Sequence, residues 1–211
     1  MVRKANSAPA PASRTKAAAP VQRARQEVRI IGGSWKRTPL LVLDRPGLRP
    51  TPNRVRETLF NWLGGDLTGW SCIDAFAGSG ALGFEAASRG AREVMLVEQD
   101  AALIGPLRSL QARLGATTVR VMHADGIAVL RGCAEGSSDL VFLDPPFDST
   151  RYDEALQAAA RALAPQGLVY LEAATAWAPP RLQALGLSLH RQLKAGAVVA
   201  HLLKREPLRH A

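Results

Sequence analysis

Three glycines behind a short apolar stretch constrain the fold of this chain more than any other feature. Gly78, Gly80 and Gly83 complete the pattern G-x-G-x-x-G directly after the strand-like stretch 72–74. This pattern predicts a buried strand, a tight turn and a helix whose first N–H groups stay available to a ligand. Glycine lets the backbone approach a bound cofactor closely. By itself, the pattern fits NAD, FAD or S-adenosylmethionine equally well.

Strand-like and helix-like segments alternate from Trp70 onward. This alternation predicts an α/β fold with a doubly wound, mostly parallel, Rossmann-like sheet of seven strands. The last two strands are joined so tightly, at 194–196, that they have to form an antiparallel hairpin. The predicted strands cover residues 70–75, 93–97, 118–122, 139–143, 167–172, 187–193 and 196–203. The predicted helices cover residues 79–89, 101–114, 151–163 and 179–185, with a shorter helical turn after Asp125.

A small extension is predicted before this sheet. Two short apolar runs, 28–31 and 40–43, predict a β-hairpin with a basic loop. We expect Asn53 to cap a helix that runs to Leu63, with its apolar face in the core and its arginines mostly off that face. The predicted organisation is a disordered basic tail at 1–26, an extension at 27–65 and a sheet domain at 66–206.

Positive charge is concentrated early in the chain. The net charge is +9, and residues 1–26 carry six basic residues and no acid, which leaves +3 for the remainder. From 29 to 56 there are seven basic residues against one acid. Such a surface favours a polyanion, because Lys and Arg on phosphates release counterions, although a solvated tail without function is the alternative. The candidate contacts to a nucleic acid are Arg29, Lys36, Arg37, Arg54 and Arg56.

The composition of the N-terminus leaves two locations open. Ala, Ser, Pro and Arg without acids fit a disordered tail on a bacterial cytoplasmic protein, which we favour, and they also fit an organellar transit peptide. Cys72 and Cys133 are too few for a disulfide framework and indicate a reducing compartment. The chain has no apolar run of membrane-spanning length and no histidines at ligand spacing, so we expect neither a membrane anchor nor a metal site.

Three acids follow predicted strands, at the edge where open α/β sheets bind their ligands. Asp74 precedes the glycine turn, where an acid would repel a pyrophosphate but would suit the ammonium group of S-adenosylmethionine. Glu98 can accept hydrogen bonds from ribose hydroxyls in either kind of nucleotide site. Asp125 either accepts a hydrogen bond from an adenine amino group or caps a helix, and the residues alone do not decide between these roles.

A fourth acid begins the tetrapeptide Asp144-Pro145-Pro146-Phe147, which ends the apolar run 139–143. The two prolines stop the strand and hold Asp144 in extended geometry. A carboxylate, two rigid rings and an aromatic ring predict a small socket for a flat group with polar edges. The alternative is a strand, a turn and a core phenylalanine.

Together, these motifs resemble those of the class I S-adenosylmethionine-dependent methyltransferases. The order and spacing of 74–80, Glu98, Asp125 and 144–147 carry the resemblance, and D-P-P-F is similar to the tetrad of enzymes that methylate exocyclic amino groups of nucleobases. Upstream, the stretches 29–33, 48–63 and 87–91 resemble the 16S ribosomal RNA guanine-N2 methyltransferases. The resemblance covers residues from about 27 to about 206. Asn53 departs from it, because an Asp is expected there.

The resemblance implies methyl transfer from S-adenosylmethionine to N2 of a guanine in 16S ribosomal RNA, within an assembling small subunit. It implies that the extension at 27–65 faces RNA and covers the cofactor. We expect Asp144 and the Pro145 carbonyl to accept the two amino hydrogens of an unpaired or flipped-out guanine, while Phe147 stacks on the base. The expected catalytic residues are Asp144, Pro145, Pro146 and Phe147, and the expected cofactor-binding residues are Asp74, Phe76, Gly78, Ser79, Gly80, Glu98, Asp125 and Thr51.

Other functions remain open at this point. The same tetrad serves adenine-N6 and cytosine-N4 methyltransferases of DNA or RNA. A nicotinamide-dependent oxidoreductase explains the glycines and Glu98, but it gives no role to residues 144–147. A non-catalytic RNA-binding assembly factor is a further alternative. A chain with one core and one basic face is expected to act as a monomer.

Overall fold

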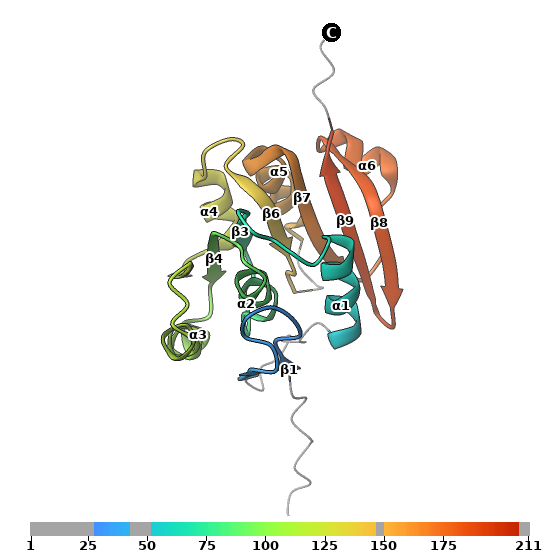
Figure 1. Ribbon diagram of the computed structural model, residues 1–211. Helices are drawn as coiled ribbons and strands as arrows, with labels where there is room; N and C mark the ends of the chain where they lie inside the picture. The colour runs from blue at the N-terminus through green and yellow to red at the C-terminus, as the bar shows by residue number, and fades with distance from the viewer. Residues whose placement is uncertain (1–27, 43–51, 147–149, 207–211) are drawn as a thin grey trace, which may run out of the picture.

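A computed structural model of the chain describes residues 28–42, 52–146 and 150–206 (Figure 1). The predicted tail at 1–26, Thr51 and Phe147 lie outside these residues. Within them, seven strands form one sheet in the order β5-β4-β3-β6-β7-β9-β8, and β1 and β2 form a separate hairpin. The strands are β1 Val28–Arg29, β2 Pro39–Leu40, β3 Ser71–Asp74, β4 Glu93–Glu98, β5 Val119–His123, β6 Ser138–Leu143, β7 Leu163–Ala173, β8 Leu187–Ala195 and β9 Val198–Arg205.

The strand directions confirm the predicted fold class. Strands β5, β4, β3, β6 and β7 run parallel to one another, whereas β9 pairs antiparallel with both β7 and β8. The carboxyl ends of the five parallel strands therefore meet at one edge of the sheet, where this type of fold binds its ligands.

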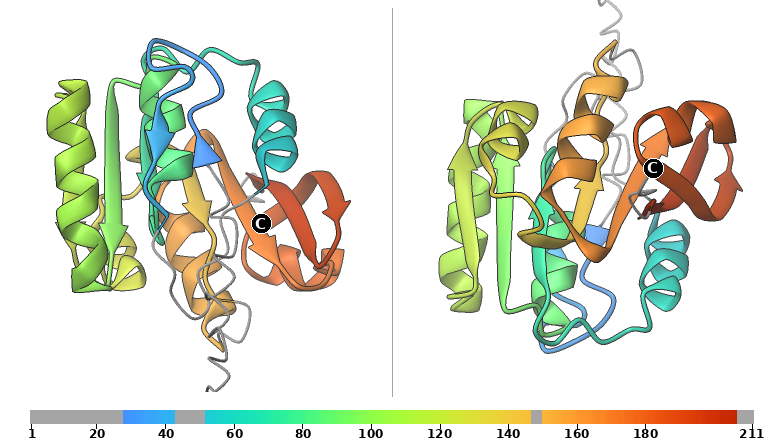
Figure 2. Two further views of the ribbon diagram at one scale, coloured as in Figure 1. Left: turned by 90° about the horizontal axis from the view of Figure 1, so that it is seen from below. Right: turned by 90° about the horizontal axis from the view of Figure 1, so that it is seen from above.

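Helices cover both faces of the sheet, as the two opposite views of Figure 2 show. One hydrophobic core lies under α1, α2, α3 and the β1–β2 hairpin, and a second lies under α4, α5 and α6. The helices are α1 Asn53–Trp62, α2 Ala81–Ser88, α3 Ala101–Leu114, α4 Gly126–Gly132, α5 Tyr152–Ala162 and α6 Pro179–Ala184. None of these helices in the described ranges is long and apolar enough to cross a membrane.

Aromatic rings hold α1 against the sheet. The ring of Phe60 on α1 lies 6.3 Å from that of Phe142 on β6, which in turn lies 6.3 Å from the ring of Tyr170 on β7. All three side chains are fully buried. Burying an aromatic side chain contributes roughly 1.5–3 kcal/mol, so this row fixes α1 over β6 and β7.

One local prediction is wrong. Pro52, not Asn53, is the N-cap residue of α1, and no side chain of residues 28–42, 52–146 or 150–206 caps this helix end. Oδ1 of Asn53 instead accepts a hydrogen bond from Nη2 of Arg56 at 2.6 Å. The reason is burial: Arg56 has no access to water and needs an acceptor, whereas the Val55 and Arg56 amides in the first turn of α1 already donate to the Pro52 carbonyl.

Candidate functional site

The glycine turn between β3 and α2 has the geometry that its sequence predicted. Gly80 adopts a left-handed conformation, with φ of 77°, and is the N-cap residue of α2. A Cβ atom on Gly80 would lie 2.6 Å from Phe84, and one on Gly83 would lie 2.0 Å from Leu96. These two positions therefore require glycine, because any side chain would push the turn and α2 away from the sheet. Ser79 and Phe76, in the same turn, are half-buried.

Asp74 ends β3 below this turn and is almost completely buried. Its Oδ2 accepts a hydrogen bond from the Gly83 amide at 3.0 Å, and its Oδ1 is buried without a hydrogen-bond partner among the described residues. Burial raises the pKa of Asp74 to about 7. A buried acceptor that lacks a donor is unfavourable unless a ligand supplies the donor, and an ammonium group would do so.

Glu98 ends β4, next to β3, and organises the same turn. Its Oε2 accepts a hydrogen bond from the Gly78 amide at 2.8 Å, and its Oε1 accepts one from the Asp100 amide at 2.7 Å. Each carboxylate oxygen has a second lone pair, so Glu98 can hold the turn and still accept hydrogen bonds from two ribose hydroxyls.

Asp125 follows β5 and caps α4, so the helix-capping alternative is confirmed. Its Oδ1 accepts a hydrogen bond from the Ile127 amide at 2.9 Å, and its Oδ2 is 2.9 Å from Nη1 of Arg151. The hydrogen bond from Arg151 is the main reason that the pKa of Asp125 is lowered. Sequence reasoning did not identify Arg151, because nothing in the linear sequence connects it to Asp125.

Asp144 directly follows the last residue of β6, at the same edge of the sheet. The Asp144 side chain is half-buried, Pro145 is buried and Pro146 is exposed. Two β7 side chains that sequence reasoning missed lie on the adjacent strand. Glu172 is only 2% exposed, and its Oε1 accepts a hydrogen bond from the hydroxyl of Tyr170 at 2.7 Å. In the sequence, Glu172 could have been found as the acid that directly follows the apolar run 168–171.

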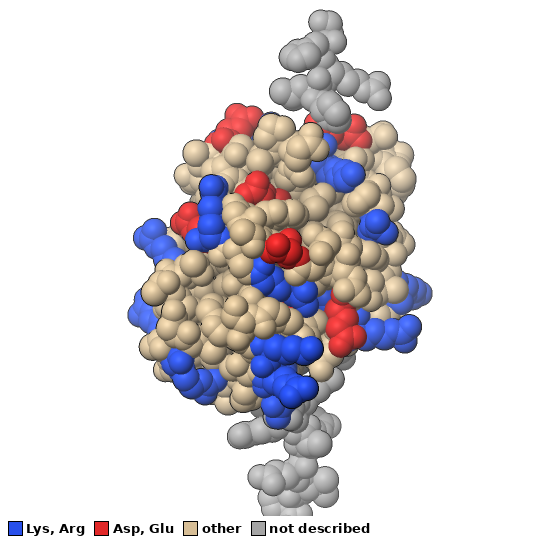
Figure 3. Space-filling model, in the orientation of Figure 1, with Lys and Arg blue, Asp and Glu red and all other residues tan. Residues whose placement is uncertain are grey.

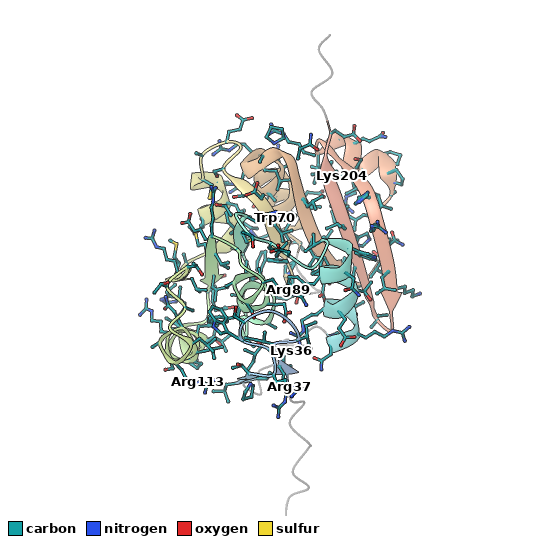
Figure 4. All side chains as sticks on the ribbon, in the orientation of Figure 1. Lys36, Arg37, Trp70, Arg89, Arg113 and Lys204 are labelled. Atoms are coloured by element: carbon teal, nitrogen blue, oxygen red, sulfur yellow. The ribbon has the colours of Figure 1, made fainter. Side chains whose placement is uncertain are left out.

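Basic side chains gather over the hairpin, in the lower part of the face shown in Figure 3. Arg29, Lys36, Arg37 and Arg54 are exposed, and Nη1 of Arg29 donates to the Arg37 carbonyl at 3.0 Å. Figure 4 places Lys36 and Arg37 on the hairpin and Arg113 on the neighbouring helix α3. The predicted basic surface of the extension is therefore accessible at these four positions.

Arg56 is not part of this surface, so the prediction that it contacts RNA is wrong. It is completely buried, and its Nη2 donates to the Arg29 carbonyl at 2.8 Å as well as to Asn53. Glu85 on α2, also completely buried, lies 3.9 Å from Nη1. Desolvation lowers the pKa of Arg56, and Glu85 opposes this shift. The sequence periodicity placed Arg56 off the apolar face, but a buried carboxylate compensates its charge there.

Comparisons with known proteins agree with this arrangement. The family model described as Conserved hypothetical protein 95 matches residues 28–204. The Ribosomal RNA small subunit methyltransferase D of Escherichia coli strain K12 is 42% identical over 183 residues, which are 85% of this chain and 91% of that protein. The solved structure of yhhF from Escherichia coli superposes with a TM-score of 0.73 at 37% identity, covering 85% of this chain and 98% of that chain.

A more distant structure shares the fold alone. The 1,6-didemethyltoxoflavin-N1-methyltransferase of Burkholderia thailandensis, solved with bound S-adenosylhomocysteine, superposes with a TM-score of 0.58 at 17% identity. The match covers 74% of this chain and 78% of that chain. The glycine turn and the strand-end acids of the present chain thus belong to a fold that is also found in a methyltransferase of a small molecule.

Proposed function

Because this chain belongs to the family described as Conserved hypothetical protein 95, we propose that it methylates the exocyclic N2 of a guanine in 16S ribosomal RNA with S-adenosylmethionine as the methyl donor. The resemblance found in the sequence is confirmed at the level of the family, and the chain is a ribosomal RNA methyltransferase of the small subunit. The choice of guanine, of its N2 atom and of the residues below is our proposal.

The site fits the proposed cofactor through the unpaired acceptor at Asp74. We assign the cofactor's ammonium group to Oδ1 of Asp74, its ribose hydroxyls to Glu98, and its adenine amino group to a remaining lone pair of Asp125. Gly78, Ser79 and Gly80 let the backbone approach the cofactor closely, and Phe76 contributes a half-buried ring. Thr51 has the same proposed role and lies outside the described residues.

The tetrapeptide 144–147 has to prepare a weak nucleophile. The lone pair of the guanine 2-amino group is delocalised into the ring. The cofactor supplies a methyl group on a sulfonium sulfur, and the neutral thioether that remains after transfer is a good leaving group. The Asp144 carboxylate and the Pro145 carbonyl accept the two amino hydrogens, which favours a pyramidal nitrogen with its lone pair directed at the methyl group. Pro146 and Phe147 confine the base, and Asp144 is positioned to take up the released proton.

The RNA has to present its target base unpaired. A base within a helix cannot reach a carboxylate at the edge of the sheet, so the guanine is either single-stranded or flipped out. The exposed side chains of Arg29, Lys36, Arg37 and Arg54 then hold the flanking phosphates.

The observation that carries this proposal is that four acids lie at, or within two residues of, the carboxyl ends of four parallel strands at one edge of the sheet: Asp74, Glu98, Asp125 and Asp144. To test it, the protein is incubated with methyl-labelled S-adenosylmethionine and small subunits that lack their native methylations, and the labelled nucleoside is identified after digestion. We expect N2-methylguanosine with the wild type and at least a hundredfold slower labelling with Asp144→Ala.

Glu93→Ala is the matched control, because this exposed carboxylate lies at the amino end of β4, away from the site. It should methylate at the wild-type rate. Label in methyladenosine or methylcytidine would retain the fold and the cofactor but reject the substrate, and wild-type labelling by Asp144→Ala would reject the role of Asp144.

A further inference from the structure

Glu172 is a buried carboxylate to which the mechanism above gives no role. It is 2% exposed, and the Tyr170 hydroxyl donates to it at 2.7 Å. Burial, followed by the charge of Glu172, raises the pKa of Tyr170 well above its usual range, so this hydroxyl keeps its proton and acts as a donor. Removing a carboxylate from water costs several kcal/mol, and such groups cluster where function requires them.

Strand pairing places Glu172 beside Asp144. Phe142 on β6 lies opposite Tyr170 on β7, and their rings pack edge to face on the side of the sheet that α1 covers. The last pair of this register is Leu143 opposite Leu171. Asp144, directly after β6, and Glu172 on β7 are the next residues in sequence. Because side chains alternate and paired strands are roughly 5 Å apart, the two carboxylates lie next to each other on the same face.

The charge of Glu172 also reaches the opposite side of the site. Burial is the main cause that raises the pKa of Asp74 to about 7, and the charges of Glu98 and Glu172 add to it. The charge of Asp144 in turn contributes to the raised pKa of Tyr170. In the strand order β3-β6-β7, Asp144 lies between Asp74 and Glu172, so the three acids follow one another along this edge of the sheet.

Two adjacent carboxylates form a row of hydrogen-bond acceptors, and among the bases considered this row matches only guanine. The 2-amino group of guanine is adjacent to N1–H, so both groups donate. In adenine the amino group is adjacent to N1, and in cytosine it is adjacent to N3, and both of these ring nitrogens carry a lone pair that a carboxylate repels.

We propose that Glu172 accepts a hydrogen bond from N1–H of the target guanine while Asp144 holds the 2-amino group, and that this pair selects guanine over adenine and cytosine. The inference rests on the proposed function, since it requires a guanine acceptor. It makes Glu172 a specificity residue that contacts the substrate. The base enters beside the half-exposed Asp144 and reaches the deeper Glu172 with its N1 edge.

The test replaces the target guanine by 2-aminopurine in small subunits assembled on ribosomal RNA that carries one synthetic segment. This base keeps the reacting 2-amino group but has a lone pair at N1. The ratio of kcat/KM for guanine to that for 2-aminopurine is measured for the wild type and for Glu172→Gln. Glutamine is isosteric, accepts from the Tyr170 hydroxyl through its carbonyl and offers an N–H to the N1 lone pair.

We expect the wild type to prefer guanine by at least a hundredfold, because a site built for an N–H rejects an analogue without it. Glu172→Gln should lower this ratio by at least tenfold, mainly by faster methylation of 2-aminopurine. The loss of O6 in 2-aminopurine affects both proteins equally and cancels in the comparison.

The control is Glu93→Gln, which makes the same change at an exposed carboxylate at the amino end of β4, away from the site. It should leave the ratio unchanged, so that the loss of one negative charge is separated from base selection. If guanine is methylated at N2 and the ratio is the same for the wild type and Glu172→Gln, the role of Glu172 is refuted and the proposed function stands. If the wild type does not methylate guanine at N2, both fail.

Discussion

Glu85 is the buried anion that joins the N-terminal extension to α2, and replacing it by alanine should strongly destabilise the protein. Its Oε2 accepts a hydrogen bond from the Ile31 amide at 2.7 Å, its Oε1 accepts one from Nε of Arg89 at 2.8 Å, and Arg56 lies 3.9 Å away. Arg56 and Glu85 have no exposed side-chain surface, so solvent does not screen their attraction.

The expected loss follows from what Glu85→Ala leaves behind. Removing one partner of a buried ion pair typically costs about 3–5 kcal/mol, because the remaining charge is uncompensated. An Ile31 amide without an acceptor adds to this loss. For a domain of this size, 1 kcal/mol corresponds to roughly 2–4 °C in Tm, so Tm should fall by at least about 6 °C. Urea unfolding supplies the free energy of unfolding.

Two further variants make this experiment decisive. Glu154→Ala removes a carboxylate from an exposed pair with Arg131 and should cost less than about 1 kcal/mol. The double variant Arg56→Met/Glu85→Leu should recover much of the stability that Glu85→Ala loses, since apolar residues of similar volume replace buried ion pairs well. A loss below about 1 kcal/mol for Glu85→Ala would refute the reasoning and indicate that water reaches Arg56.

Four other outcomes are expected. Gly83→Ala should lower the free energy of unfolding by about 1–3 kcal/mol in urea titrations, because its Cβ would lie 2.0 Å from Leu96; unchanged stability would show that α2 can shift without loss. The pKa of Asp74 is about 7 in the folded protein, against a value near 4 in the unfolded chain. Between these two pH values the unfolded chain has lost the proton that the folded protein keeps, so the cofactor-free protein loses stability as the pH rises from about 4 through 7. Asp74→Asn should abolish this dependence. Cofactor affinity, measured by calorimetry, should rise over the same interval, because the ammonium group requires the ionised form. Lys36→Ala/Arg37→Ala should reduce the slope of log K for RNA against log salt by about 1–2, and an unchanged slope would remove these residues from the RNA contact.

Local sequence signals predicted those parts of the fold and site that depend on neighbouring residues. The glycine turn after β3 is an example, since the spacing of its glycines behind a strand is a local pattern, although Leu96 on β4 is what excludes a side chain at Gly83. Asp144 was placed at the end of β6 for the same reason: two prolines stop a strand wherever it lies. The tight connection before Val198 likewise determined the antiparallel end of the sheet.

Tertiary neighbours decided the parts that the sequence did not reveal. Arg56 lies off the apolar stripe of α1 and therefore looked exposed, but Glu85, from another helix, meets it in the interior. Glu172 closes the predicted strand 167–172 and drew no prediction, and only the register of β7 against β6, whose last pair is Leu143 opposite Leu171, points to a position beside Asp144. Burial of a charge depends on a partner that can come from any point in the chain, so periodicity within one element cannot predict it.

Helix α2 connects the two halves of the proposed reaction. Its N-terminus carries the glycine turn assigned to the cofactor, and Ser88 near its other end receives the hairpin assigned to RNA. The Ser34 amide donates to the Ser88 carbonyl at 2.8 Å, and the Trp35 amide donates to its Oγ at 2.9 Å. Gly33 allows this approach, because a Cβ atom at this position would lie 1.8 Å from the Ser88 carbonyl oxygen. Because every residue of α2 is buried, the helix cannot shift without disturbing the core, and the hairpin and the cofactor turn keep a fixed separation. Methyl transfer requires this constancy, since an error of about 1 Å between donor and acceptor costs on the order of a hundredfold in rate.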